Sequence, residues 1–336
     1  MRIVDMHCDT ISVLLKKRRA GVEMGLREND CHLDLHKMRK GDYLLQNFAL
    51  FVELGACEDP WREVQELYGL YEREIRDNGG EIAPVLFRHD IEKNRTAGKM
   101  SALLSVEEGG VCGGDLEKLR TLYAQGVRMM TLTWNYPNEL GYPNFSGGAR
   151  KREERTLEYL NTPNTADGLT KTGIAFVEEM EKLGMIVDVS HLSDAGFYDV
   201  LAHTKKPFVA SHSNARALCP CVRNLTDDMI RRLAERGGVI GLNFCADFLE
   251  QVPAGEKNPG TIRAVVEHAK HIASVGGIEC LGLGSDFDGI VTHEELTGAD
   301  RMAELADALK KGGFSESESD KILGGNVLRV YREILI

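Results

Sequence analysis

The sequence lacks the features of several protein classes. It has eight cysteines but no CxxC pair, and a chain of 336 residues does not depend on disulfide bonds for its core. No stretch approaches the ~18 apolar residues of a membrane span. The first residues, MRIVDMHCDT, lack the apolar run of a signal peptide, and the last, VYREILI, are too short for a lipid-anchor signal. We therefore expect a cytoplasmic protein with reduced thiols. The CxC formed by Cys219 and Cys221 leaves a redox or metal pair as the alternative.

Basic residues are fewer than acidic ones. There are 41 Lys and Arg against 52 Asp and Glu, which gives a net charge of −11. Nucleic acid is an unexpected partner, because proteins that bind it usually carry a basic face. The 43% of hydrophobic residues is enough for a sizeable core. No linker divides the chain, so we expect a single domain over 1–336.

Short apolar runs rich in β-branched residues alternate with longer amphipathic stretches. Each run is too apolar to have one wet face, as expected for a parallel sheet covered by helices. Eight such alternations predict a closed (β/α)₈ TIM barrel. A doubly wound open sheet is the alternative, but DMHCDT stands where its glycine fingerprint would follow the first strand. The predicted strands are 2–6, 44–52, 102–107, 127–134, 185–190, 207–211, 239–244 and 280–285.

Apolar spacing and capping residues predict the helices. Thr226 is a candidate N-cap, and Ser315 with Glu318 fits a capping box. Two connections are long: 53–101 has room for a helix and a short strand at 82–87, and 135–165 is predicted to be mostly loop. Long loops in compact domains are usually functional or disordered. The predicted helices are 61–78, 115–125, 166–183, 226–235 and one that begins at about 316.

Polar residues follow five of the predicted strands. In a barrel, the carboxyl ends of all strands meet on one face, where active sites form. His7 and Asp9 are two residues apart, so their side chains share one side of an extended strand. Histidines and carboxylates converging on one rim are candidate ligands for divalent metal ions, and two such ions about 3.5–4 Å apart can generate a nucleophilic hydroxide. Asp5 and Asp188 are expected to pair with backbone amides, and Asp288 to occupy a turn. The strand ends are DMHCD at 5–9, EEGG at 107–110, DVSH at 188–191, SHSN at 211–214 and SDFDG at 285–289.

These motifs resemble the renal (membrane) dipeptidase family of zinc peptidases. The match extends over almost the whole chain, and the order and spacing of its motifs are specific. The resemblance implies a (β/α)₈ fold, two Zn²⁺ ions and cleavage of dipeptides, including many with a D-residue at the C-terminal position. Members often form homodimers. The matching motifs are DMHCDT, VEEGG, VDVSH, SHSN, VRN, SDFDG and GGNVLRV.

The resemblance also implies residue roles. His7 and Asp9 match the ligands of one zinc, and His191 and His212 those of the second. Glu107 matches the bridging carboxylate; the family has one Glu before its glycine pair where this chain has two, and an ungapped register favours Glu107 over Glu108. Asp286 matches the acid/base aspartate, and Arg223 the arginine that holds the substrate carboxylate. The implied reaction is attack by a metal-bridging hydroxide on the peptide carbonyl.

One position departs from the family pattern. The fourth strand of the family often ends TLTH, and this histidine helps to polarise the scissile carbonyl; here the strand ends in Thr133 and Trp134. An indole offers one N–H and no acceptor, so it does not replace an imidazole. Asn135 is an alternative contact for the oxyanion, or a zinc ion is sufficient.

Two other functions remain open from the sequence. One is a related amidohydrolase-like barrel that acts on another amide, a lactam, a lactone or a phosphoester. Such binuclear sites often use a carbamylated lysine, and Trp134 and Asn135 offer no lysine at the fourth strand end. The other is a non-catalytic barrel that binds a metabolite. The complete ligand set together with Asp286 favours an enzyme.

Overall fold

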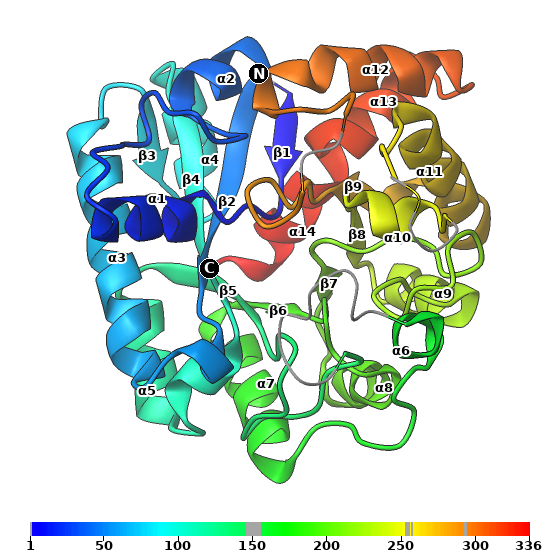
Figure 1. Ribbon diagram of the computed structural model, residues 1–336, viewed down its shortest axis with the longest axis horizontal. Helices are drawn as coiled ribbons and strands as arrows, with labels where there is room; N and C mark the ends of the chain where they lie inside the picture. Colours follow the sequence, from blue (N-terminus) through cyan, green and yellow to red (C-terminus); the bar gives the residue numbers. More distant parts are fainter. Residues whose placement is uncertain (1, 146–155, 253–255, 257, 292–293) are drawn as a thin grey trace.

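Eight parallel strands close into a barrel surrounded by helices (Figure 1). The computed structural model describes residues 2–145, 156–252, 256, 258–291 and 294–336. The order around the barrel is β1-β2-β4-β5-β6-β7-β8-β9, and β9 pairs with β1. The predicted (β/α)₈ barrel is confirmed, and the open-sheet alternative is wrong. The strands are β1 Ile3–Asp5, β2 Tyr43–Phe51, β4 Met100–Glu107, β5 Val127–Thr131, β6 Ile186–Asp188, β7 Val209–Ala210, β8 Val239–Leu242 and β9 Leu281–Leu283.

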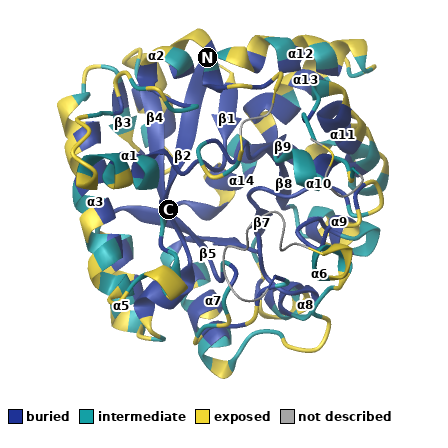
Figure 2. Ribbon diagram, viewed as in Figure 1, coloured by how far each residue is buried: buried dark blue, intermediate teal, exposed yellow. Residues whose placement is uncertain are grey.

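Both faces of these strands are buried, which explains why their sequences are continuously apolar (Figure 2). Neighbouring residues alternate between two cores. Ile3 belongs to the core shared with the outer helices, whereas Val4 belongs to the core inside the barrel. Val327 and Tyr331 of α14 (Asn326–Ile334) join the inner core.

Most predicted helices are present, with shifted ends. The side chain of Thr226 accepts a hydrogen bond from the amide of Met229, and Ser315 and Glu318 form the predicted capping box. The helix predicted at 166–183 begins only at Lys171, because the side chain of Thr170 caps it. The helices are α1 Thr10–Arg19, α2 Leu35–Lys40, α3 Pro60–Asp77, α4 Asp90–Thr96, α5 Leu116–Ala124, α6 Leu157–Asn161, α7 Lys171–Leu183, α8 Asp194–His203, α9 Asp227–Glu235, α10 Ala246–Leu249, α11 Ile262–Gly276, α12 Met302–Lys311 and α13 Glu316–Asp320.

The short strand predicted at 82–87, between β2 and β4, is present but has only three residues. This strand, β3 (Ile82–Pro84), pairs with the beginning of β4, next to the place where β5 pairs with its end. Strand β5 ends at Thr131, three residues earlier than predicted, so Trp134 lies beyond the strand. Of the predicted loop 135–165, residues 146–155 lie outside the described residues, and α6 occupies part of the rest.

None of the described helices is both long and apolar enough to cross a membrane.

Candidate metal centre

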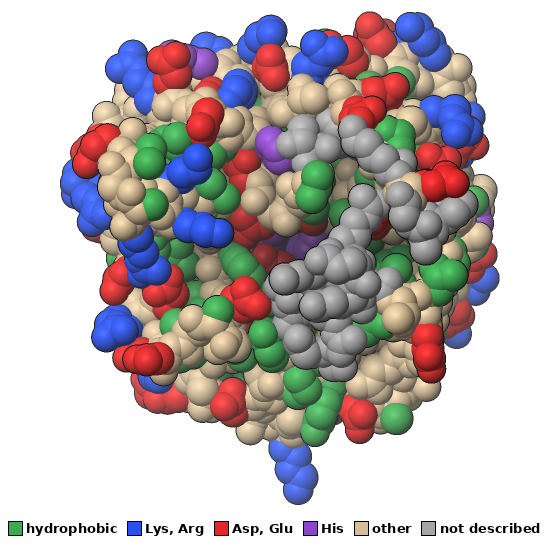
Figure 3. All heavy atoms as spheres, in the orientation of Figure 1, with side chains coloured by type: hydrophobic (Ala, Val, Ile, Leu, Met, Phe, Trp, Pro, Cys, Tyr) green, Lys and Arg blue, Asp and Glu red, His purple; other side chains and the backbone are tan. Residues whose placement is uncertain are grey.

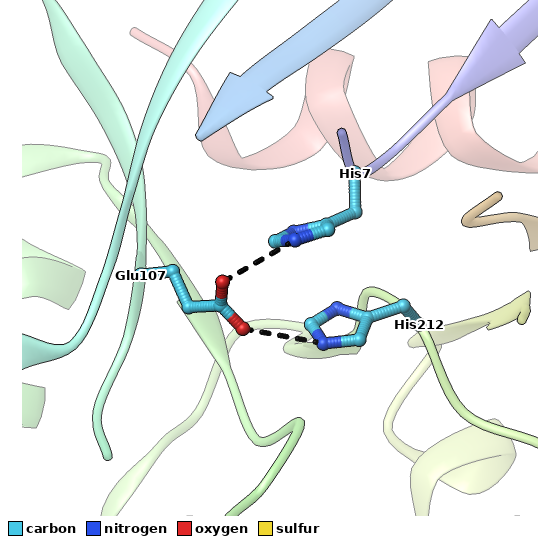
Figure 4. Close-up of side chains that lie close together, drawn as sticks. All are labelled: His7, Glu107 and His212. Carbon is cyan, nitrogen blue, oxygen red and sulfur yellow. Dashed lines mark ion pairs between the residues drawn. The ribbon is translucent and has the colours of Figure 1, made fainter. Parts of the chain in front are cut away.

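Three histidines and a glutamate meet at the carboxyl end of the barrel. His7 follows β1, Glu107 ends β4, and His191 and His212 follow β6 and β7. The Nε2 atom of His7 lies 3.4 Å from Oε2 of Glu107, and that of His212 lies 3.5 Å from Oε1 (Figure 4). His191 Nε2 lies 3.1 Å from the same Oε1. All four side chains are buried, so the carboxylate of Glu107 lies between imidazoles on both of its oxygens.

Two more carboxylates extend this cluster on the side of His7. His7 Nε2 lies 3.3 Å from Oδ2 of Asp9 and 3.9 Å from Oδ1 of Asp286. The described residues thus contain two groups whose ligand atoms lie within 4.8 Å of one another: His7, Glu107 and His212, and His7, Asp9 and Asp286. The structure therefore brings the five residues predicted to bind metal and Asp286 into one place. His7 belongs to both groups, so the division of ligands between two ions is implied by the family resemblance and not by these groups.

The protonation of His191 and His212 suits metal binding, whereas burial of His7 is outweighed by the charges of Glu107 and Asp9, which raise the pKa of His7 well above its usual value. Burial alone would raise the pKa of Glu107, but the charge of His7 and hydrogen bonds from the three histidines hold that pKa well below its usual range. Burial, together with the charge of Arg223, lowers the pKa of His191 to about 4. Burial and the charge of His7 hold the pKa of His212 well below its usual value. At pH 7 both imidazoles are neutral, which is the form that binds metals.

Unsatisfied atoms in the cluster also fit a metal ion. The Nε2 atoms of His191 and His212 lie 3.1 Å apart and approach the same oxygen of Glu107. Asp9 Oδ1 is buried and has no hydrogen-bond partner among the described residues. Buried polar atoms are normally paired, and imidazole with carboxylate is a usual donor set for zinc and related divalent ions.

Neighbouring polar groups orient the histidines. The Oγ of Ser211 lies 2.7 Å from Nδ1 of His212, and Oδ1 of Asn135 lies 3.0 Å from Nδ1 of His191. Contacts of this kind fix which ring nitrogen faces a metal. The sequence predicts only a substrate contact for Asn135, and its position against His191 is a finding of the structure. No sequence signal pointed to this contact, because it joins loops after different strands.

Glu108 faces away from the histidines. Its backbone is left-handed, with φ of 99°, so its side chain diverges from that of Glu107. The carboxylate accepts hydrogen bonds from the amides of Trp134 (3.0 Å) and Gly110 (2.8 Å). Burial raises the pKa of Glu108 to about 7. Glu108 thus connects two loops, and Glu107 is the glutamate in the cluster.

Asp286 is positioned by backbone shape and by one hydrogen bond. It has a left-handed φ of 62°, and its Oδ2 accepts a hydrogen bond of 3.0 Å from Asn243 Nδ2. Burial and the charges of Asp9 and Glu107 raise the pKa of Asp286 to about 7, against the opposing effect of His7. A carboxyl group with a pKa near neutrality can both accept and donate a proton at physiological pH.

The turn after Asp286 approaches the carboxylates closely. A Cβ atom at Gly289 would lie 2.2 Å from Oδ2 of Asp9 and 2.6 Å from Oδ1 of Asp286. Asp288 accepts hydrogen bonds from the hydroxyl of Thr10 (2.6 Å) and the amide of His32 (2.7 Å). Gly289 therefore leaves room for the two carboxylates that a side chain would displace.

The remaining polar strand ends are structural. Asp5 accepts hydrogen bonds from the amides of His7 and Ser285, as predicted. Asp188 accepts them from the amides of Ser190 and Ser211. Cys219 and Cys221, which form the CxC motif, are buried and have free thiols. Neither belongs to a metal-ligand group among the described residues.

The cluster forms the floor of a cavity of about 420 Å³, which Figure 3 shows as a hollow with histidine and acidic side chains at its base. Arg223 lines this cavity with only 3% of its surface exposed. Its Nη2 donates to the carbonyl of His212 (3.2 Å), whereas its Nε has no partner in the described part of the chain. Trp134 also lines the cavity, with its ring 6.1 Å from that of His191.

Fold and site together define a class. A buried set of histidines and carboxylates at the carboxyl end of a (β/α)₈ barrel, open to a cavity, is the arrangement of a metal-dependent hydrolase. The comparison with protein families then gives the particular group: the family of membrane dipeptidases, peptidase family M19, matches residues 1–335. The chain belongs to this family and is by class a metal-dependent dipeptidase.

Individual relatives agree with this assignment. An uncharacterised dipeptidase of Schizosaccharomyces pombe is 31% identical over 360 aligned positions, which cover 99% of this chain and 80% of the relative. Among solved structures, dipeptidase AC, a metallopeptidase of family M19, is 26% identical with a TM-score of 0.89 and covers 100% of this chain and 99% of its own. A metallopeptidase from Rhodobacter sphaeroides, liganded with a phosphinate mimic of the dipeptide L-Ala-D-Ala, is 25% identical with a TM-score of 0.87 and covers 99% of both chains.

Proposed function

We propose that this protein is a binuclear zinc dipeptidase that hydrolyses dipeptides, among them dipeptides with a D-residue at the C-terminal position. The observation that carries the proposal is the buried carboxylate of Glu107 between three imidazoles, at the floor of a cavity that also holds Arg223. His7 and Asp9 would hold one ion, His191 and His212 the other, and Glu107 would lie between them. When bound, the zinc ions lower the pKa of a water molecule and polarise the peptide carbonyl.

Arg223 supplies the recognition of a free C-terminus. A buried guanidinium without a carboxylate partner is costly for the fold, and the described residues contain no ion pair to Arg223. The α-carboxylate of a dipeptide would satisfy this charge through paired N–H donors. Because Arg223 shares one cavity with the metal cluster, it would hold the carboxylate close to the scissile bond. The short separation between Arg223 and the metal cluster would restrict the substrate to very short peptides.

Asp286 moves the proton in this mechanism. Asn243 occupies Oδ2 of Asp286, so Oδ1 is the oxygen that faces His7 and Asp9. We assign Oδ1 to accept the proton of the attacking water and to deliver it to the leaving amine. The pKa of about 7 for Asp286 suits both halves of this transfer.

Two observations bear on stereochemistry and location. The Rhodobacter sphaeroides relative binds a mimic of a dipeptide whose second residue is D-Ala, which supports tolerance of a C-terminal D-residue in this chain. All eight cysteines are free, which supports the prediction of a reducing, cytoplasmic compartment.

A metal and activity assay tests the proposal. The purified chain is loaded with zinc, its metal content is measured, and kcat/KM is determined for matched L,L and L,D dipeptides. A His191→Ala variant is measured in parallel. We expect close to two zinc ions per chain, cleavage of both series, and loss of metal and activity in His191→Ala. Failure to bind zinc would refute the metal centre. Full zinc binding without cleavage of any dipeptide would refute the substrate class.

A further inference from the structure

The basic residues at the end of α1 differ in their ion pairing. The last turn of this helix contains Lys16, Lys17, Arg18 and Arg19. Lys17 pairs with Asp30 at 3.7 Å, Arg18 with Glu74, and Arg19 with Glu63 at 2.7 Å. Lys16 is exposed, forms no ion pair with any described residue, and lines the cavity above the metal centre. Among the described residues it is therefore an unpaired cation at the edge of the cavity.

The wall next to Lys16 is largely apolar. Val13, one turn earlier on α1, and Phe51 at the end of β2 also line the cavity. The amide of Phe51 donates to the hydroxyl of Ser12 (3.2 Å), which fixes α1 against the end of β2. Trp134 packs on Phe51 with ring centroids 4.8 Å apart. The wall thus offers an apolar surface for methylene groups with a positive charge at its edge.

This wall lies away from Arg223 in the barrel. Helix α1 begins directly after Asp9 and follows β1, whereas Arg223 lies in the connection after β7. Strands β8 and β9 separate β1 from β7 on one side, and β2, β4, β5 and β6 separate them on the other. If Arg223 holds the α-carboxylate of the second residue, the wall of α1 faces the side chain of the first residue.

We propose that Lys16 is a specificity-determining residue that favours dipeptides whose N-terminal residue has an acidic side chain. The inference rests on the proposed function, because it uses Arg223 to orient the dipeptide. The methylenes of an N-terminal glutamate pack on Val13 and Phe51, and its carboxylate meets Nζ of Lys16. The α-carboxylate is already held by Arg223, so the side-chain carboxylate is the anion that remains for Lys16.

Isosteric substrates test this role. The zinc-loaded enzyme and its Lys16→Met and Lys16→Glu variants are assayed with L-Glu-L-Ala and L-Gln-L-Ala, which differ only in charge. We expect Lys16→Met to lower the ratio of kcat/KM for the two substrates about fivefold, as for one partly exposed charge pair. Lys16→Glu is expected to lower it further, and added salt to reduce the wild-type preference. Lys17→Met is the matched control, because Lys17 pairs with Asp30 outside the cavity.

The outcomes separate this inference from the proposed function. The reversed pair, L-Ala-L-Glu and L-Ala-L-Gln, should show no comparable change in ratio on Lys16→Met. If the reversed pair changes instead, Lys16 faces the second residue and the inference is wrong. If dipeptides are cleaved but the Glu-to-Gln ratio is the same in wild type and Lys16→Met, the inference alone fails. If the zinc-loaded wild type cleaves no dipeptide, the proposed function fails and the inference with it.

Discussion

Replacing Gly289 with alanine tests the geometry of the metal centre by adding one methyl group. The new Cβ would lie 2.2 Å from Asp9 Oδ2 and 2.6 Å from Asp286 Oδ1, whereas ordinary contacts begin at 3.4 Å. The carboxylate of Asp9 must therefore move by about 1 Å, and a displacement of this size in a reacting geometry costs about 100-fold in rate. We expect kcat/KM to fall about 100-fold and zinc affinity to fall with it. The fold should lose about 1–3 kcal/mol, as is usual for an extra methyl in a packed site.

The assay compares Gly289→Ala with Gly80→Ala. A Cβ at Gly80 would have no atom within 4 Å, so this variant controls for the glycine-to-alanine change itself. Zinc content, kcat/KM for one dipeptide and the free energy of unfolding are measured for both. A Gly289→Ala enzyme with full zinc content and wild-type kcat/KM would show that Asp9 and Asp286 do not need their observed positions.

Three further predictions concern single residues. Asp286→Asn should lower kcat by at least about 100-fold while zinc remains bound, since a positioned acid/base supplies about 10²–10⁴ in rate; wild-type turnover would refute its role. Arg223→Met should raise KM strongly without lowering the melting temperature, because it removes a buried charge that has no carboxylate partner among the described residues; a large loss of stability would contradict that explanation. Burial lowers the pKa of His268 to about 4. Between pH 6.5 and about 4, His268 is therefore protonated in the unfolded chain but neutral in the folded chain. The free energy of unfolding should fall by about 2 kcal/mol between pH 7 and 5. His268→Gln should remove this part of the pH dependence in denaturant titrations.

The sequence predicted the barrel because its strands are buried on both faces. Continuous apolar runs such as 44–52 have no solvent-exposed face. Strands that are buried on both faces indicate a parallel sheet covered by helices, with long connections between the strands. Once the strands are parallel, their carboxyl ends must meet, so His7, Glu107 and His212 could be expected on one rim from their places after different strands. Pattern and topology were enough for this part of the site.

Other parts of the site depend on contacts that no local pattern encodes. His191 and Asp286 have left-handed φ values of 68° and 62°, which only the packing around them can maintain. The same is true of the contact between Asn135 and His191, and of the close approach of Gly289 to Asp9. The predicted end of β5 is too late because Leu132 and Trp134 are still apolar after the backbone has left the sheet. Such features arise from residues far apart in the chain.

The number of backbone pairs between neighbouring strands varies around the barrel, and this affects which part of it opens first. Strands β2 and β4 pair continuously from Leu45–Ser101 to Phe51–Glu107. By contrast, β6 and β7 share only the pair Asp188–Val209, and β1 and β9 share only the pair Asp5–Leu283. At the first of these two seams, the carboxylate of Asp188 links β5, β6 and β7 through Thr131 and Ser211. Local opening requires the least free energy where backbone pairing is sparse. The strand ends that carry His7 and Arg223 would therefore separate under milder heat or denaturant than the β2–β4 pairing that ends at Glu107, so the geometry of the cavity would be lost before the barrel unfolds.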